Sequence, residues 1–300
     1  MAAGREQKIG IAYGLSAYLW WGFVALYFKV VAETTPLELL VHRIVWSWLL
    51  LVAGLLIRGR GREFIDLFRH RRTFLTMQGT TLLIALNWLV FIWAITNDRV
   101  LEASLGYFIN PLVNVLLGFL FLGERLRWIQ GAAVLLAALG VLWLSLSLGA
   151  PPYVALVLAF SFGLYGLLRK IARPSGVQGL AAETTLLLPL ALTYFVWLWC
   201  SGDVIFGQIS REMDLLLMAS GLITALPLVW FAEAARRLRY ATVGFLQFIA
   251  PSLQFVLAVV VFHEPFTRAH MISFALIWSA LVLFSWDSLR CLRFGPATAG

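Results

Sequence analysis

Amide side chains stand on either side of a proline in two apolar segments, and amides in such surroundings are suited to binding ligands by hydrogen bonds. They are Asn110, Pro111 and Asn114 in the segment 101–122, and Gln247, Pro251 and Gln254 in the segment 241–262. Proline lacks a backbone donor and disturbs the helical hydrogen bonds one turn earlier, so Pro111 and Pro251 predict kinked helices beside a binding site. Alternatively, the prolines set packing angles only, and the amides join neighbouring helices.

Further polar and aromatic side chains fall at similar depths in other apolar segments. We expect the following residues to line the same site: Trp20, Trp21, Asn87, Trp88, Tyr107 and Tyr165. Aromatic walls suit flat apolar or amphipathic ligands. The alternative for the aromatic rings is that they face lipid or form belts at the membrane surfaces.

Titratable groups near the segment ends are candidates for proton coupling or for ion pairing. Glu38 and His42 are four residues apart and share one helix face. His42, Arg43 and Glu102 are the candidates, because a partly buried carboxyl or imidazole can titrate near neutral pH. The alternative is a set of ion pairs that fix helix ends, such as Arg43 with Glu102.

The sequence contains few residue patterns that are typical of catalysis. The sequence contains no Gly-x-Ser-x-Gly elbow and no phosphate-binding glycine loop. His263, Glu264 and His270 share one loop, but their spacing matches no metal motif, and we expect a solvated loop. We therefore predict no catalytic residue, no metal site and no cofactor.

The elements that must position these residues are membrane-spanning helices. Hydrophobic residues make up 61% of the chain and charged residues 13%, whereas a soluble domain carries about 25% charged residues. Crossing the bilayer takes roughly 20 apolar residues. Ten segments qualify: 10–32, 37–57, 74–96, 101–122, 129–148, 152–169, 180–200, 214–235, 241–262 and 270–288. We predict an all-α polytopic membrane protein with ten transmembrane helices.

Basic residues orient these helices. If the N-terminus is cytoplasmic, the inner segments hold 18 of the 23 Lys and Arg residues. This asymmetry follows the positive-inside rule and predicts that both termini are cytoplasmic. The net charge of +8 is therefore a topology signal, and no nucleic-acid partner is expected. The basic segment 59–72 is either a short helix on the anionic inner leaflet or a simple topology anchor.

The chain repeats itself. Residues 82–124 and 222–264 align without a gap at an offset of 140, which pairs Pro111 with Pro251 and Glu124 with Glu264. Five helices per unit is an odd number, so the second unit enters the membrane inverted. We predict two inverted five-helix repeats, residues 8–148 and 151–289, with a binding site between them.

The sequence also resembles a known family. HRIVWS (42–47), NWLVFIWAIT (87–96), LEASLGYFINPLVNVLLGFLFLGERL (101–126) and ATVGFLQFIAPSLQFVLAV (241–259) are similar to segments of the drug/metabolite transporter superfamily. The similarity is to its ten-helix branch with two EamA-type repeats, and within it to the RarD proteins. It spans residues 8–288 and implies a fold and a transport class, but no substrate.

These observations predict a secondary transporter in the bacterial inner membrane, which moves a small neutral or zwitterionic metabolite or drug-like compound by alternating access. The expected direction is export, the expected partners are the substrate and membrane lipids, and protons are a candidate partner. Another hypothesis is a membrane-embedded enzyme or a scaffold that acts on lipid or a lipid-linked substrate. It would require a reactive nucleophile or a metal set at one membrane depth.

Overall fold

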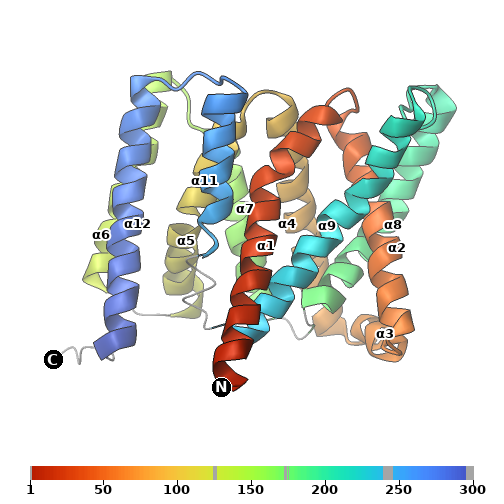
Figure 1. Ribbon diagram of the computed structural model, residues 1–300, viewed down its shortest axis with the longest axis horizontal. Coiled ribbons are helices and arrows are strands. Elements are labelled where there is room, and N and C mark those ends of the chain that lie inside the picture. The colour runs from red at the N-terminus through yellow and green to blue at the C-terminus, as the bar shows by residue number, and fades with distance from the viewer. Residues whose placement is uncertain (1, 124–126, 172–173, 175, 239–245, 295–300) are drawn as a thin grey trace.

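The computed structural model describes residues 2–123, 127–171, 174, 176–238 and 246–294. Its elements are α1 (Ala2–Val30), α2 (Pro36–Ile57), α3 (Gly61–Arg69), α4 (Arg71–Thr96), α5 (Val100–Leu122), α6 (Trp128–Leu148), α7 (Tyr153–Ile171), α8 (Gly176–Ser201), α9 (Arg211–Arg237), α11 (Ile249–Val256), the π-helix η1 (Leu257–Val261) and α12 (Arg268–Phe294) (Figure 1). Expectations that involve Glu124, Arg125, Arg173, Arg239 and the start of the ninth apolar segment lie outside the described residues.

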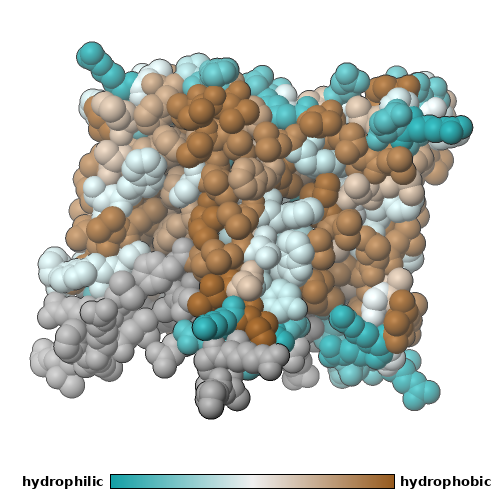
Figure 2. Space-filling model, in the orientation of Figure 1, coloured by the Kyte–Doolittle hydropathy of each residue, from teal (hydrophilic) through white to brown (hydrophobic). Residues whose placement is uncertain are grey.

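The chain is an all-α polytopic membrane protein. Among the described residues, eight helices are long and apolar enough to cross a membrane. Two shorter apolar helices, Tyr153–Arg169 and Ile249–Val261, fall in the sixth and ninth predicted segments. On the face shown in Figure 2, hydrophobic residues cover the middle of the molecule and hydrophilic residues gather at its two ends.

Local sequence signals set several helix boundaries. Thr35 accepts a hydrogen bond from the backbone N–H of Glu38, and Pro36 occupies the first turn of α2, where its missing N–H costs nothing. Ser210 caps α9 in the same way by accepting from the N–H of Met213. Gly123 and Gly149 end α5 and α6 in the left-handed conformation, with φ of 65° and 71°.

The basic segment between α2 and α4 forms the short helix α3, as one of the two interpretations predicted. None of its residues is buried, and Ile65 is 55% exposed. Gln178 on α8 donates to Glu63 at 2.8 Å, which ties α3 to the bundle. Because α3 carries an apolar face and basic residues outside the core, it fits a helix that lies on a membrane surface.

The helices pack as a bundle whose ends we call upper and lower, as they stand in Figure 1. The upper end holds the starts of α2 and α5, and the lower end holds the start of α1 and the end of α12. The main packing pairs are α1–α9, α4–α7, α5–α7, α1–α11, α2–α9, α4–α8, α2–α8, α5–α11 and α6–α12. The α6–α12 pair lies at one edge, and α2 with α8 lies at the other (Figure 1).

The two repeated prolines occupy different local structures. Helix α5 runs from Val100 to Leu122 with Pro111 inside it. Pro251 instead lies in the first turn of α11, and a turn occurs at Gln247 and Phe248 just before that helix. This turn lies one turn before Pro251, where the sequence predicts a disturbed helix, because proline lacks the N–H that would bond to the carbonyl four residues earlier.

Candidate functional site

A buried polar cluster joins α4, α5 and α7. The Asn87 amide donates to the Leu158 carbonyl at 3.1 Å and to the Ser161 hydroxyl at 3.0 Å. The Tyr107 hydroxyl donates to the Asn87 carbonyl oxygen at 3.1 Å. Both ends of the Asn87 side chain therefore have protein partners, and only the half-buried Tyr107 ring reaches accessible space.

Two more amides extend this cluster toward the lower end. Asn110 is fully buried and donates to the Ala159 carbonyl on α7 at 3.1 Å. Asn114 donates to the Asn110 side-chain oxygen at 3.1 Å, and Asn114 itself is exposed. A polar side chain at that depth in a spanning helix is costly against lipid, so Asn114 is expected to face a water-filled space.

The amides predicted on the second wall differ from each other. Gln254 is buried, and its amide donates to the Trp21 carbonyl on α1 at 3.1 Å, while its Oε1 has no partner. Trp21 packs edge-on against Tyr18, with ring centroids 5.4 Å apart. Gln247 is half-buried in the turn before α11, and the described residues place no hydrogen bond on its side chain. Gln247 is therefore the more available of the two for a ligand.

Arg43 extends from α2 toward α1, α4 and α9. Its Nε donates to the Thr224 hydroxyl at 2.8 Å, and its guanidinium carbon lies 4.3 Å from the centroid of the Trp88 ring. The Phe28 ring is 5.8 Å away. Trp88 is thus buried beneath the Arg43 cation. Among aromatic side chains, the tryptophan ring is the most favourable partner for such a contact.

Trp20 lies in a cleft between α1 and α9. Its Nε1 donates to the Ile223 carbonyl at 3.1 Å, and its ring meets Trp230 edge-on at 5.7 Å. The cleft has a volume of about 510 Å³ and is lined by Ser16, Leu19, Trp20, Phe23, Val24, Tyr27, Ile223 and Trp230. Leu19 and Phe23 are 42% and 46% exposed, so the cleft opens at the lipid-facing side of α1.

Tyr165 belongs to a separate polar contact. Its hydroxyl donates to Glu183 at 3.2 Å, and Glu183 is fully buried on α8. The structure therefore does not gather all the predicted residues around one point. It groups Asn87, Tyr107, Asn110 and Asn114 on α4 and α5, and it places Gln254, Trp20 and Tyr165 in three other contacts.

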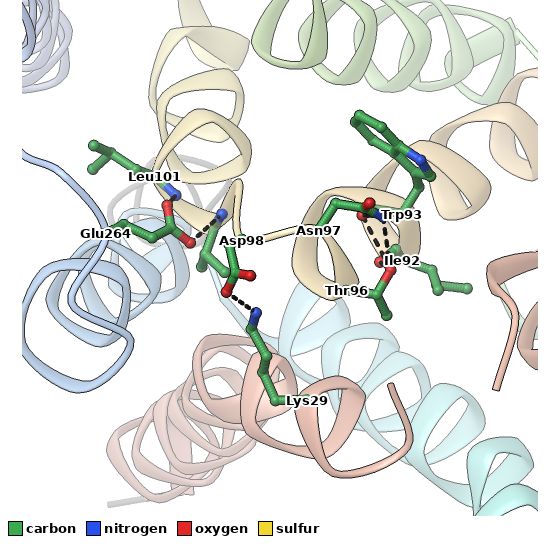
Figure 3. A network of polar contacts seen from close by, with 9 residues as sticks. Lys29, Ile92, Trp93, Thr96, Asn97, Asp98, Leu101 and Glu264 are labelled. Atoms are coloured by element: carbon green, nitrogen blue, oxygen red, sulfur yellow. Dashed lines mark hydrogen bonds and ion pairs between the residues drawn. The ribbon is translucent and has the colours of Figure 1, made fainter. Parts of the chain in front are cut away.

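Glu264 links two segments that are distant in sequence at the upper end (Figure 3). Its carboxylate accepts from the backbone N–H of Val100 at 2.7 Å and of Leu101 at 2.8 Å. These N–H groups begin α5 and have no partner within the helix, and the helix dipole favours a negative charge there. We call Glu264 and the N–H groups of Val100 and Leu101 the upper clamp.

Burial of the Glu264 carboxylate opposes part of the stabilisation that the upper clamp provides. Burial raises the pKa of the Glu264 carboxyl above its ordinary value, while the N–H groups of Leu101 and Val100 act in the other direction. The hydrogen bonds thus offset only part of the hydration that the carboxylate loses.

The local backbone geometry orients Glu264 toward the start of α5. After the π-helix η1, His263 takes a φ of 55°, and this turns Glu264 back toward α5. Asp98, just before α5, has a φ of 56° and pairs with Lys29 on α1 at 2.5 Å (Figure 3). His263 and Asp98 are the non-glycine residues with positive φ in the described chain, and such strain is maintained where surrounding contacts require it.

The other titratable candidates also lie at the upper end. Glu38 is fully buried and accepts from the N–H groups of Ile205 and Phe206 at 2.8 and 3.1 Å, which links α2 to the loop between α8 and α9. His42 lies 4.0 Å from Glu38, so the shared helix face is confirmed. The nitrogen Nδ1 of His42 accepts from the indole of Trp46 at 3.2 Å.

The predicted pair of Arg43 with Glu102 is wrong. Glu102 instead pairs with Arg99 at 3.1 Å, one turn away at the start of α5. Arg43 points into the bundle toward Thr224. Glu102 lies in the first turn of α5, whereas Arg43 is the eighth residue of α2, and the two side chains have different partners.

Sequence reasoning missed the role of Glu264, which was expected in a solvated loop and is 7% exposed. The available signal was the match of Glu124 and Glu264 in the repeat. It also missed Thr224 and Ser220, which lie one turn apart in the otherwise apolar middle of α9. Hydroxyls at a spacing of four residues on such a helix indicate a polar stripe that faces another helix.

Comparisons with known proteins agree with this membrane architecture. A family model described as the EamA-like transporter family matches residues 8–146. An uncharacterized transporter of Vibrio cholerae is 46% identical over 95% of each chain. The protein RarD of Streptomyces exfoliatus is 43% identical over 98% of this chain and 93% of its own. A solved crystal structure covers 93% of this chain and 98% of its own, with a TM-score of 0.59 and 22% identity, which shows the fold alone.

Proposed function

The chain belongs to the EamA-like transporter family, as a RarD-like member of the drug/metabolite transporter superfamily, and from this premise we propose its activity. It is a secondary transporter that carries a small neutral or zwitterionic metabolite or drug-like compound across the bacterial inner membrane. Transport proceeds by alternating access in the direction of export, and the protein is not an enzyme.

One observation carries the proposal, namely that packing pairs recur when the two halves are exchanged. Let α1, α2, α4, α5 and α6 correspond to α7, α8, α9, α11 and α12. The pairs α1–α9, α5–α7 and α2–α9 then become α7–α4, α11–α1 and α8–α4, and all six are packing pairs. The pairs α2–α8, α5–α11 and α6–α12 map onto themselves. This pattern supports two inverted repeats, residues 8–148 and 151–289, which rock against one another.

The proposed binding site lies between the halves. Asn87, Trp88, Tyr107, Asn110 and Asn114 form one wall. The opposite wall comprises Trp20, Trp21, Tyr165, Gln247 and Gln254. The matched amide contacts support this arrangement, because Asn110 joins α5 to α7 and Gln254 joins the corresponding helices α11 and α1.

The structure fits a state that is closed at its upper end, which we propose faces the periplasm. Two carboxylates link the halves there, since Glu264 holds the start of α5 and Glu38 holds the loop at Ile205 and Phe206. The exposed Asn114 lies eight residues from the end of α5 at Leu122, or about 12 Å from it. An exposed amide at that depth is consistent with access from the cytoplasm.

Cys200 tests the proposed orientation. It is exposed near the upper end of α8, so a membrane-impermeant maleimide is expected to label it from outside intact cells. A Cys291→Ser background leaves Cys200 as the remaining cysteine, because the sequence contains 2. Labelling of Cys200 only after the cells are permeabilised would reverse the orientation and place both termini in the periplasm.

Counterflow in proteoliposomes tests transport itself. Liposomes preloaded with one unlabelled compound are expected to accumulate its radiolabelled form transiently, for at least one compound in a panel of amino acids, their amides and neutral drug-like aromatics. Protein-free liposomes and protein unfolded by heat are the controls. Absence of counterflow across the panel, with folded and monodisperse protein, contradicts the proposed substrate class. An imposed pH gradient that changes the accumulated level would identify protons as the coupled ion.

A further inference from the structure

Arg43 carries a positive charge deep in the bundle. It lies seven residues beyond Pro36 in the 22-residue helix α2, which places its backbone about 10 Å below the upper end. Phe28 from α1, Trp88 from α4 and Thr224 from α9 surround the guanidinium. Helices from both halves of the chain therefore meet at this charge.

Two contacts fix the orientation of the guanidinium. Trp88 lies beneath it at 4.3 Å, and Thr224 accepts from Nε at 2.8 Å. The Thr224 hydroxyl in turn donates to the Ser220 carbonyl at 2.9 Å, so its oxygen is free to accept. Thr224 is 2% exposed. The side of the guanidinium that carries Nε is thus held, and Nη1 is left for another partner.

That other partner is missing from the described residues. Nη1 is buried and has no hydrogen-bond partner, and the described residues place no carboxylate in an ion pair with Arg43. The nearby carboxylates are engaged elsewhere, Glu38 with backbone N–H groups and Glu102 with Arg99. Other arginines in the described chain do have acidic partners: Arg60 with Glu63, Arg69 with Asp66, Arg99 with Glu102, Arg127 with Asp287 and Arg237 with Glu233.

A buried guanidinium without an anion is energetically unfavourable, and the cost at membrane depth is several kcal/mol on most scales. A structural arginine would be expected to have a carboxylate of the protein beside it. Among the described residues, the site therefore offers an unused donor at Nη1 of Arg43 and no acceptor for it.

We propose that Arg43 binds the carboxylate of the transported molecule, with Thr224 and Trp88 as positioning residues. This inference rests on the proposed function. It selects the zwitterions that carry a carboxylate from the proposed substrates, and it extends the substrate class to monoanions. A carboxylate only accepts hydrogen bonds and matches the planar face of a guanidinium. One positive charge balances one carboxylate, whereas a phosphate dianion would require a second cation.

Tyr27 relates the Arg43 site to the cleft described above. Tyr27 lines the cleft of about 510 Å³ between α1 and α9, and it lies near enough to Arg43 to interact with its charge. The Tyr27 hydroxyl donates its hydrogen to the Leu216 carbonyl at 2.9 Å. It therefore has no hydrogen left to donate to a carboxylate at Arg43.

Thermal unfolding of the purified protein tests the assignment with matched probes. The pairs are acetate and acetamide, phenylacetate and phenylacetamide, and L-phenylalanine and L-phenylalaninamide, at constant ionic strength balanced with chloride. A ligand of the folded state raises the unfolding temperature in proportion to its occupancy. In the unmodified protein, at least one carboxylate is expected to act at a concentration at least tenfold lower than its amide, because a charge-assisted hydrogen bond contributes that much or more.

The variant Arg43→Gln is expected to remove this preference, and Arg60→Gln, an exposed arginine at the lower end, is expected to retain it. If Arg43→Gln does not fold, Thr224→Val keeps the charge but releases Nε, and it should weaken carboxylate binding several-fold. The proposal is overturned if no carboxylate is preferred over its amide in the unmodified protein, or if the preference survives in Arg43→Gln.

Counterflow separates this inference from the proposed function. Carboxylate binding that depends on Arg43, without counterflow of any panel compound, would contradict the proposed transport function and support the carboxylate site. Counterflow of neutral compounds without any carboxylate preference would support the transport function and contradict the carboxylate site at Arg43.

Discussion

Replacing Glu264 with alanine is expected to open the upper end of the bundle. The closed arrangement would then contain two backbone N–H groups, of Val100 and Leu101, without the carboxylate that now accepts from them at 2.7 and 2.8 Å. Each buried donor left unpaired costs about 1–3 kcal/mol, and water satisfies both donors in the open arrangement. A shift of about 3 kcal/mol changes the ratio of open to closed molecules by about 150-fold.

A thiol introduced by Ser104→Cys reports this opening, in a background that lacks the native cysteines. Ser104 is fully buried on α5, and its hydroxyl donates to the Pro251 carbonyl at 2.8 Å. An impermeant maleimide should react slowly with this thiol when Glu264 is present and at least tenfold faster in Glu264→Ala. The conservative Glu264→Gln keeps an acceptor without the charge, so an intermediate rate is expected.

Glu33→Ala is the matched control for this result, because Glu33 is an exposed glutamate at the same end. It should leave the labelling rate unchanged. Equal rates in Glu264→Ala and the parent would show that the clamp does not hold the upper end closed. Net counterflow in Glu264→Ala should fall at least tenfold, because alternating access requires both ends to close in turn.

Asn87→Leu is expected to destabilise the fold by about 2 kcal/mol. The leucine has a similar volume but loses three contacts, to Leu158, Ser161 and Tyr107. Hydrogen bonds between membrane helices contribute about 0.6 kcal/mol each on average, and the Ser161 and Tyr107 hydroxyls would be left with fewer partners. The unfolding temperature in detergent is the measurement.

Two variants distinguish a structural amide from one that binds ligand. Asn97→Leu, at the exposed end of the same helix, should change the unfolding temperature little. Gln247→Ala should also leave stability unchanged, yet weaken counterflow, because the described residues give Gln247 no partner to lose. Asn87→Leu with full stability and reduced counterflow would instead assign Asn87 to substrate contact.

The helices were largely predictable because bilayer thickness fixes their length and apolar character. The segments 37–57, 101–122 and 129–148 agree with α2, α5 and α6 to within one residue at each end. Hydropathy alone did not show that the backbone turns at Gln247 before α11 begins, and Pro251 was the residue that indicated a disturbed helix there. Apolar composition says how much chain can lie in the membrane, but it does not say where the helical hydrogen bonds are broken.

The polar contacts were less predictable because helix direction and rotation decide them. The sequence shows that Arg43 and Glu102 lie at similar depths, yet it does not show which faces of α2 and α5 they occupy, and Glu102 pairs locally with Arg99. Glu264 follows a π-helix and a residue with positive φ, and neither feature has a clear sequence signature. Repeat symmetry identified Glu264 as unusual without showing its partner.

The depth of Arg43 has an electrical consequence. Its place about a third of the way along α2 puts it inside the voltage drop of an energised membrane. In the proposed orientation, an uncompensated carboxylate that reaches Arg43 from the cytoplasm crosses about two-thirds of the field in the favourable direction, which contributes about 1.5 kcal/mol at 100 mV, interior negative. The same anion arriving from the periplasm is opposed by about 0.8 kcal/mol. A resting cell would therefore load this site with monoanions from within, and a zwitterion would be indifferent to the voltage.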